Sequence, residues 1–155
     1  MTDLQQFGIL TGRGKHAEEA MYCLALIYNI CNAKITNYLK KYGLSIGKFN
    51  ILVAIKVHGG EEGLSQIDIS KHLIVTPSNM TKLIDKLEKD GLVTRSPLPK
   101  DRRVNIIKVT KKAADLIDGI WEEYTKQLNE QMKGLDDEDK SIVAAKLVKW
   151  LNTLM

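Results

Sequence analysis

Lysine and arginine side chains are concentrated in one segment of the chain, between residues 71 and 112. This segment holds eleven of them against four acidic residues, which gives it a charge of +7. The whole chain carries +4, so the other 113 residues sum to −3. A basic block within a slightly acidic chain is typical of a surface that binds a polyanion. A merely solvated surface has the same composition, and charge alone does not separate the two.

The two cysteines, Cys23 and Cys31, stand eight residues apart. On one helix this spacing is about two turns, or about 12 Å along the axis. A disulfide needs Cα atoms within about 7 Å, so the two cannot bond to each other within one chain. The sequence therefore predicts two reduced, buried thiols, and it leaves a redox-sensing regulator that uses Cys23 as an alternative.

No other group of residues predicts catalysis or a cofactor. His16, His58 and His72 are scattered, with no pair at helical spacing and no Cys-x-x-Cys, so no metal site is predicted. The run 12–15, Gly-Arg-Gly-Lys, lacks the preceding strand and the spacing of a phosphate-binding loop and is interpreted as a flexible arm. Because no nucleophile–base pair and no cofactor fingerprint is present, we predict a protein that is not an enzyme and has no cofactor.

Helices must position most of these residues. Apolar residues at helical spacing, bounded by Ser, Thr, Gly and Pro, predict helices over residues 15–42, 45–59, 65–73, 76–90, 110–133 and 136–154. Between the fourth and fifth helices, the β-branched runs 92–95 and 104–109 predict two strands. Residues 96–103 contain Pro97 and Pro99 and predict a hairpin loop with a basic tip, because two prolines exclude a central strand.

This order of elements predicts a mainly α (α+β) fold, a winged helix-turn-helix with long flanking helices. In the helix opened by Thr76-Pro77, an apolar stripe faces the core: Met80, Leu83, Ile84 and Leu87. The opposite face carries polar side chains of a size that fits the DNA major groove: Ser78, Asn79, Thr81, Lys82 and Lys86. The tip of the hairpin adds Lys100, Arg102 and Arg103, which can reach phosphates or the minor groove.

The residues of this helix-turn-helix also resemble a known family. The run Ser65-Gln66-Ile67-Asp68-Ile69-Ser70-Lys71-His72-Leu73, and the run from Thr76-Pro77-Ser78-Asn79 to Gly91-Leu92-Val93-Thr94-Arg95, are similar to the DNA-binding core of the MarR family of bacterial repressors. Asp101-Arg102-Arg103, followed after five residues by Val109-Thr110, resembles the wing of that family. Three positions depart from it: Ser70 and Ala113 are small changes, whereas Ile74 is bulky for the tight turn expected there.

The resemblance implies a homodimeric transcriptional regulator, a repressor, on a pseudo-palindromic double-stranded operator. It implies a single domain over 1–155, with a DNA-binding lobe at 44–114 and dimerisation helices at 15–42 and 115–155. Apolar residues such as Trp121, Trp150 and Leu154 agree, because one small domain does not readily cover them. Asp101 is expected to brace the wing and Arg103 to enter the minor groove. The predicted DNA contacts are Thr76, Pro77, Ser78, Asn79, Thr81, Lys82 and Lys86 in the helix, Lys100, Asp101, Arg102 and Arg103 in the wing, and Ser65, Gln66 and Lys71 at phosphates.

The same resemblance implies release from DNA by a small aromatic or anionic effector. Candidate pocket residues are Tyr22, Tyr28, Tyr38, His58 and Trp121, although packing of the core or the dimer seam is the favoured interpretation for each of them. A winged helix that binds proteins instead of DNA is the alternative function. The chain has no apolar run of about 20 residues and no signal peptide, so it is expected to be cytoplasmic with no membrane partner.

Overall fold

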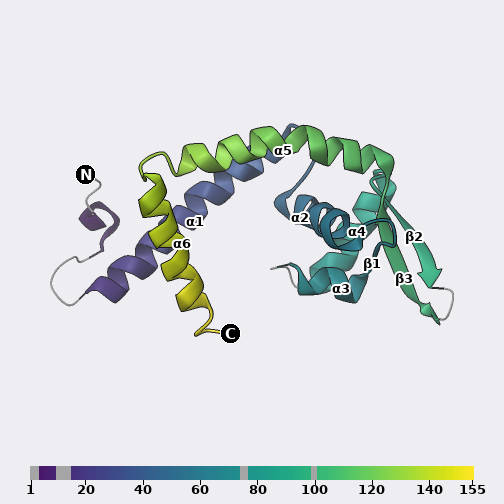
Figure 1. Ribbon diagram of the computed structural model, residues 1–155, viewed down its shortest axis with the longest axis horizontal. Helices are drawn as coiled ribbons and strands as arrows, with labels where there is room; N and C mark the ends of the chain where they lie inside the picture. The colour runs from purple at the N-terminus through teal and green to yellow at the C-terminus, as the bar shows by residue number, and fades with distance from the viewer. Residues whose placement is uncertain (1–3, 10–14, 74–76, 99–100) are drawn as a thin grey trace. The chain divides into compact units, whose positions relative to one another are not determined.

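The structure is a computed structural model that describes residues 4–9, 15–73, 77–98 and 101–155 (Figure 1). The chain folds as two compact units, residues 1–46 and 47–155, and each is described by itself. The first unit holds a single 3₁₀ turn, η1 (Leu4–Phe7), and the long helix α1 (His16–Lys40). The helix predicted over 15–42 is thus present. The helix ends at Lys40, and the turn after it reaches Gly43, whose φ of 69° is the left-handed conformation that glycine adopts freely.

The second unit contains the remaining elements in the predicted order. They are α2 (Ile46–Ala54), a π-helical turn η2 (Ile55–Gly59), β1 (Leu64–Ser65), α3 (Gln66–Lys71), α4 (Pro77–Lys89), β2 (Val93–Leu98), β3 (Asp101–Val109), α5 (Lys111–Gln131) and α6 (Asp137–Leu151). In Figure 1, α2, α3 and α4 gather beside the small sheet. Among the described residues, no helix is both long and apolar enough to cross a membrane.

Local signals set the helix ends as the sequence predicts. Ser65 Oγ accepts a hydrogen bond from the Asp68 N–H at 3.1 Å, and Thr110 Oγ1 accepts one from the Ala113 N–H at 3.2 Å. Asp136 caps α6 in the same way. Each bond satisfies one N–H that a helix start leaves without a partner. At the other end of α4, Gly91 has a φ of 67° and reverses the chain toward β2.

The sheet is larger than the sequence predicts. Its strand order is β1-β3-β2, all antiparallel, and β1 pairs Leu64 with Ile107. The predicted hairpin loop over residues 96–103 is wrong, because β2 continues to Leu98 and β3 begins at Asp101. Pro97 is paired with Asn105, and the register shifts between Pro97 and Leu98. Since β2 is an edge strand, a proline there need not remove a bond of the ladder.

Gly63 lets β1 lie against the middle strand. Its φ is 77°, and a Cβ added there would lie 2.6 Å from the Ile107 carbonyl oxygen and 2.7 Å from Lys108 Cγ. Real Cβ atoms do not approach so closely, and side chains disfavour this φ as well. A glycine is therefore required where the chain enters β1.

The core of the second unit lies where α2, α4, the sheet and the start of α5 supply apolar side chains. Its fully buried members include Ile51, Leu52, Ile55, Ile69, Met80, Ile84, Leu87 and Ile120. The apolar stripe predicted for α4 is confirmed at Met80, Ile84 and Leu87, and Leu83 is half-buried. This core fixes which face of α4 remains outside.

Candidate nucleic-acid interface

The outer face of α4 is polar and cationic. Asn79, Thr81, Lys82 and Lys86 are all exposed, opposite the buried stripe, as the sequence predicts. Lys82 and Lys86 take part in no ion pair within the described part of the chain. The helix therefore presents an amide, a hydroxyl and two unpaired ammonium groups on one side.

Several predicted contacts cannot be placed in full. Thr76 and Lys100 lie outside the described residues. The backbone of Pro77 and Ser78 belongs to α4, and that of Asp101, Arg102 and Arg103 to β3, while their side chains lie outside the described part. The hypotheses about these side chains, including the roles of Asp101 and Arg103, remain predictions.

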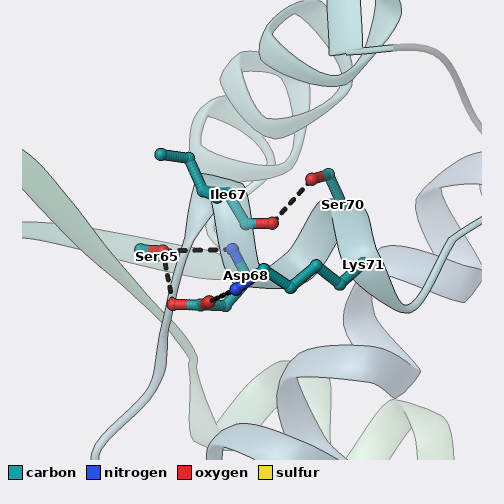
Figure 2. Close-up of polar contacts among 5 residues, drawn as sticks. All are labelled: Ser65, Ile67, Asp68, Ser70 and Lys71. Carbon is teal, nitrogen blue, oxygen red and sulfur yellow. Dashed lines mark hydrogen bonds and ion pairs between the residues drawn. The ribbon is translucent and has the colours of Figure 1, made fainter.

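The start of α3 is held by a local network of polar contacts (Figure 2). Ser65 Oγ donates to Asp68 Oδ2 at 2.6 Å, and Lys71 Nζ donates to Asp68 Oδ1 at 2.7 Å. The hydrogen bonds from Lys71 first, and then from Ser65, hold the pKa of the Asp68 carboxyl below its usual value. Ser65 is half-buried and Lys71 is exposed. Of these two predicted phosphate contacts, Lys71 is the more accessible.

Gln66 links the two helices of the helix-turn-helix. Its Nε2 donates to Thr81 Oγ1 at 2.7 Å, from the first residue of α3 to the second turn of α4. Two side chains that were predicted separately, as a phosphate contact and a recognition-helix contact, are thus brought together. The bond fixes the Thr81 hydroxyl on the outer face of α4.

Arg95 contributes to this surface in a way that the sequence analysis missed. Its guanidinium, on β2, binds Asp85 and, at 3.2 Å, Glu88, both on α4. The arginine was counted in the basic block, but its charge is used to hold the wing strand against α4. Because it takes up the two carboxylates of that helix, the nearby lysines are left without acidic partners on α4. The sequence signal that could have indicated these ion pairs was the spacing of Asp85 and Glu88, which stand one helical turn apart.

The end of α4 is anchored by the next acidic residue. Asp90 Oδ2 accepts a hydrogen bond from Lys48 Nζ at 2.6 Å, and the Asp90 carbonyl accepts one from Lys112 Nζ at 3.0 Å. The hydrogen bond from Lys48 is the main reason that the pKa of the Asp90 carboxyl lies below its usual value. α2, α4 and α5 therefore meet at one polar joint beside the lysine-bearing helix.

The five candidate effector residues fall in both units. Tyr22 and Tyr28 on α1 are exposed, and Tyr38 is buried with its ring 5.5 Å from that of Tyr42. In the second unit, Trp121 lines a hollow of about 270 Å³ with Val53, Lys56, Val57, Ile117 and Asp118, and His58 is not among its lining residues. Lys56 pairs with Asp118 in this lining. The effector pocket stays a prediction.

The histidines and cysteines differ from the expectations. His58 and His72 were considered scattered, yet their rings stack with centroids 3.9 Å apart. The sequence offered no signal, because the two residues belong to different elements. Cys23 and Cys31 are both free and half-buried, so the expectation of buried thiols is wrong for this chain.

Comparison with known proteins agrees with this geometry. The model of the MarR family matches residues 44–104. The HTH-type transcriptional regulator MhqR of Bacillus subtilis is 28% identical over 116 residues, 75% of this chain and 78% of that protein. The HTH-type transcriptional regulator YkoM of the same organism is 30% identical over 109 residues, 69% of each chain. These relatives are transcriptional regulators rather than enzymes, as predicted.

Solved structures share the fold. A MarR-like transcription regulator from Bacillus cereus superposes with a TM-score of 0.81 at 22% identity, covering 92% of this chain and all of that one. A complex of Staphylococcus aureus MepR with DNA gives a TM-score of 0.78 at 22% identity, covering 86% and 96%. The prediction of a winged helix-turn-helix with long flanking helices is confirmed.

Proposed function

Because the chain belongs to the MarR family of transcriptional regulators, we propose that it binds double-stranded DNA in a sequence-specific manner. The observation that carries this proposal is the outer face of α4, where Asn79, Thr81, Lys82 and Lys86 are exposed together. An α-helix of this width enters the major groove, where Asn can pair with adenine and Lys with guanine. The MepR complex supports it, since a protein of the same fold forms a complex with DNA.

The direct test is binding of the purified protein to duplexes from the promoter region of its own gene, with random DNA as competitor. We expect competitor-resistant binding whose logarithmic affinity falls with salt at about −0.9 per phosphate contacted. Lys82→Ala should weaken binding by about 1–3 kcal/mol and change the preferred base. Lys126→Ala is the matched control, because Lys126 is an equally exposed lysine of α5 outside the basic segment. Binding no better than to random duplex would favour a protein-docking role.

We further propose that the active form is a homodimer on a pseudo-palindromic operator. Large apolar side chains are exposed on α1, α5 and α6, among them Ile27, Tyr28, Trp121, Val148 and Leu151. Exposed large apolar side chains such as these, found in each unit by itself, are typical of a subunit interface. Two recognition helices would then meet successive half-sites about 34–36 Å apart. Sedimentation equilibrium tests the dimer, and a footprint with two protected half-sites tests the operator; a monomeric footprint would contradict it.

We propose that the protein represses transcription when it is bound to DNA, and that a small aromatic or anionic effector relieves this repression. The hollow beside Trp121 supports an effector, because it combines an aromatic wall with the apolar side chains of Val53, Val57 and Ile117. A ligand lowers DNA affinity only if it prefers a dimer whose helices no longer match the groove spacing. In a Trp150→Phe background, aromatic carboxylates that quench Trp121 fluorescence should also release operator DNA. Quenching of Trp121 without release of DNA would show that the ligand binds but does not regulate DNA binding.

A further inference from the structure

We propose that His58 and His72 form an exposed two-histidine site for a transition-metal ion such as Ni²⁺, Cu²⁺ or Zn²⁺. The two residues are fourteen positions apart, one in the π-helical turn η2 and one directly after α3. Their ring centroids are 3.9 Å apart, and the ring planes are 5° from parallel. π-Helical turns are uncommon and occur frequently at functional sites.

The two rings are close enough for a single ion to bridge them once both rings turn. A metal–imidazole bond is about 2.0–2.1 Å long, so one ion can join nitrogens up to about 4.1 Å apart. In a parallel stack the nitrogen lone pairs do not converge, and each ring must turn about its Cβ–Cγ bond. This torsion is broad for histidine, and both side chains are exposed, so the rotation meets little resistance.

The ammonium groups nearest the pair are each neutralised by a carboxylate. Lys71, next to His72, is bound to Asp68, and Lys56, two residues before His58, is bound to Asp118 and to the Ala114 carbonyl. The Asp68 carboxylate also interacts electrostatically with His72. Both neighbouring ammonium groups therefore have acidic partners, and a carboxylate lies within electrostatic reach of the ring.

The chemistry of the donors narrows the class of metal. Imidazole nitrogen suits Ni²⁺, Cu²⁺ and Zn²⁺, whereas Mg²⁺ and Ca²⁺ prefer oxygen. Among the described residues, no group of three or more histidine, cysteine or acidic side chains could hold a metal. Two imidazoles therefore supply the protein ligands and water fills the other positions, which predicts a reversible, pH-dependent site rather than a permanently filled one.

An occupied site would connect two parts of the lobe. His72 directly follows α3, and its backbone N–H donates a hydrogen bond to the Ile69 carbonyl at 3.1 Å. The ion would tie this end of the helix-turn-helix to η2, which packs against β3 and β1. Because a ligand that binds only the folded state stabilises it, Ni²⁺ should raise the melting temperature of the free protein.

The experiment uses the untagged chain without DNA, so its result is independent of the proposed function. The protein has three histidines, so its imidazole proton signals are few enough to follow one by one. We expect substoichiometric Ni²⁺ at about pH 7.5 to broaden the signals of His58 and His72 together, and to do so much less at about pH 5.5, because protons compete with the metal for imidazole nitrogen. His16, exposed on α1 beside Glu19, should keep a sharp signal.

Calorimetry with Ni²⁺ and Zn²⁺ supplies the second readout. His58→Gln and His72→Gln should each weaken binding by about tenfold or more, because one of two ligands is lost. His16→Gln is the matched control and should leave the affinity unchanged. Equal broadening of all three histidines, or unchanged affinity in both ring variants, would overturn the proposal. So would loss of binding in a Cys23→Ser/Cys31→Ser chain with both histidines intact, since the thiols would then be the ligands.

Discussion

The helix α4, whose outer face carries the exposed lysines, and the last helix α6 use apolar residues in opposite ways. Met80, Ile84 and Leu87 of α4 are completely buried. α6 has no buried residue, and its Val148 and Leu151 are 56% and 54% exposed. Both helices belong to the same unit, so the difference in burial does not come from a difference in the size of the unit.

The contrast shows which part of the unit is complete by itself. The lobe buries its apolar side chains within one chain, which supplies the main favourable term in folding. α6 is rich in Ile, Val, Leu and Ala, yet it leaves its large side chains in water; its described stabilisation is local, from the Asp136 cap and the Asp137–Lys140 ion pair. Helices that are apolar on most faces normally become buried. Within its own unit, the described residues therefore leave the apolar side chains of α6 uncovered.

The largest effect should come from the core of the lobe. Leu87→Ala removes a fully buried side chain and should lower the free energy of unfolding by about 2–5 kcal/mol, from lost burial and the cavity left behind. Urea unfolding at fixed protein concentration measures it. Leu151→Ala is the matched control in α6. A loss below about 1 kcal/mol at Leu87 would mean that the lobe is not the self-sufficient part.

The next effect should come from α6. Leu151→Glu places a charge on its exposed apolar surface and should raise the dimer dissociation constant at least about tenfold, which is about 1.4 kcal/mol. Sedimentation equilibrium provides the measurement. Lys146→Glu puts the same side chain on the same helix without removing an apolar group. If both variants dissociate equally, general charge rather than apolar contact explains the loss.

A smaller effect is expected at Thr110, which links the turn after α4 to the start of α5. Thr110 Oγ1 caps α5 and donates to the Gly91 carbonyl at 2.9 Å, so Thr110→Ala removes the cap and this link. The loss should be about 1 kcal/mol in urea unfolding. Thr110→Ser keeps the hydroxyl and should recover most of it. Equal losses in both variants would indicate that the methyl group, not the cap, stabilises the junction.

The smallest effect should be electrostatic and depend on pH. The pKa of Asp68 is lowered in the folded chain by Lys71 and Ser65, so its stabilisation is present above the unfolded pKa of about 3.9. It is lost as the pH falls through the lower folded value. The stability difference between wild type and Asp68→Asn should therefore shrink in acid. Asp115→Asn, at an exposed carboxylate without an ion pair in the described residues, is the control; a difference independent of pH would falsify the assignment.

Local sequence signals predicted much of this structure. The Ser65 and Thr110 caps, the stop at Asp90-Gly91 and the apolar spacing of α4 were identified correctly, because each depends on residues within one or two turns. The exposed face of α4 followed from the same spacing. These features are enough to predict the fold and the side of the lobe that carries the lysines.

Contacts between distant residues were the ones missed. β1 exists only because Leu64 and Ser65 pair with residues more than forty positions later. The length of the hairpin was underestimated because Pro97 excludes a central strand but not an edge. The Arg95 pairs and the His58–His72 stack likewise join separate elements. Their side chains carry no periodic signal, so only the folded chain reveals them.

The position of Pro97 also affects how the protein avoids aggregation. The described sheet has two edge strands, the two-residue β1 and the longer β2. Pro97 has no N–H to offer there, and the irregular register beside it interrupts the strand. A strand from a misfolded copy therefore cannot form a regular ladder with β2, because one N–H donor is absent and the strand is irregular. Natural sheets discourage cross-β growth by features of this kind. The exposed edge of β2 is in this way protected from seeding fibrils.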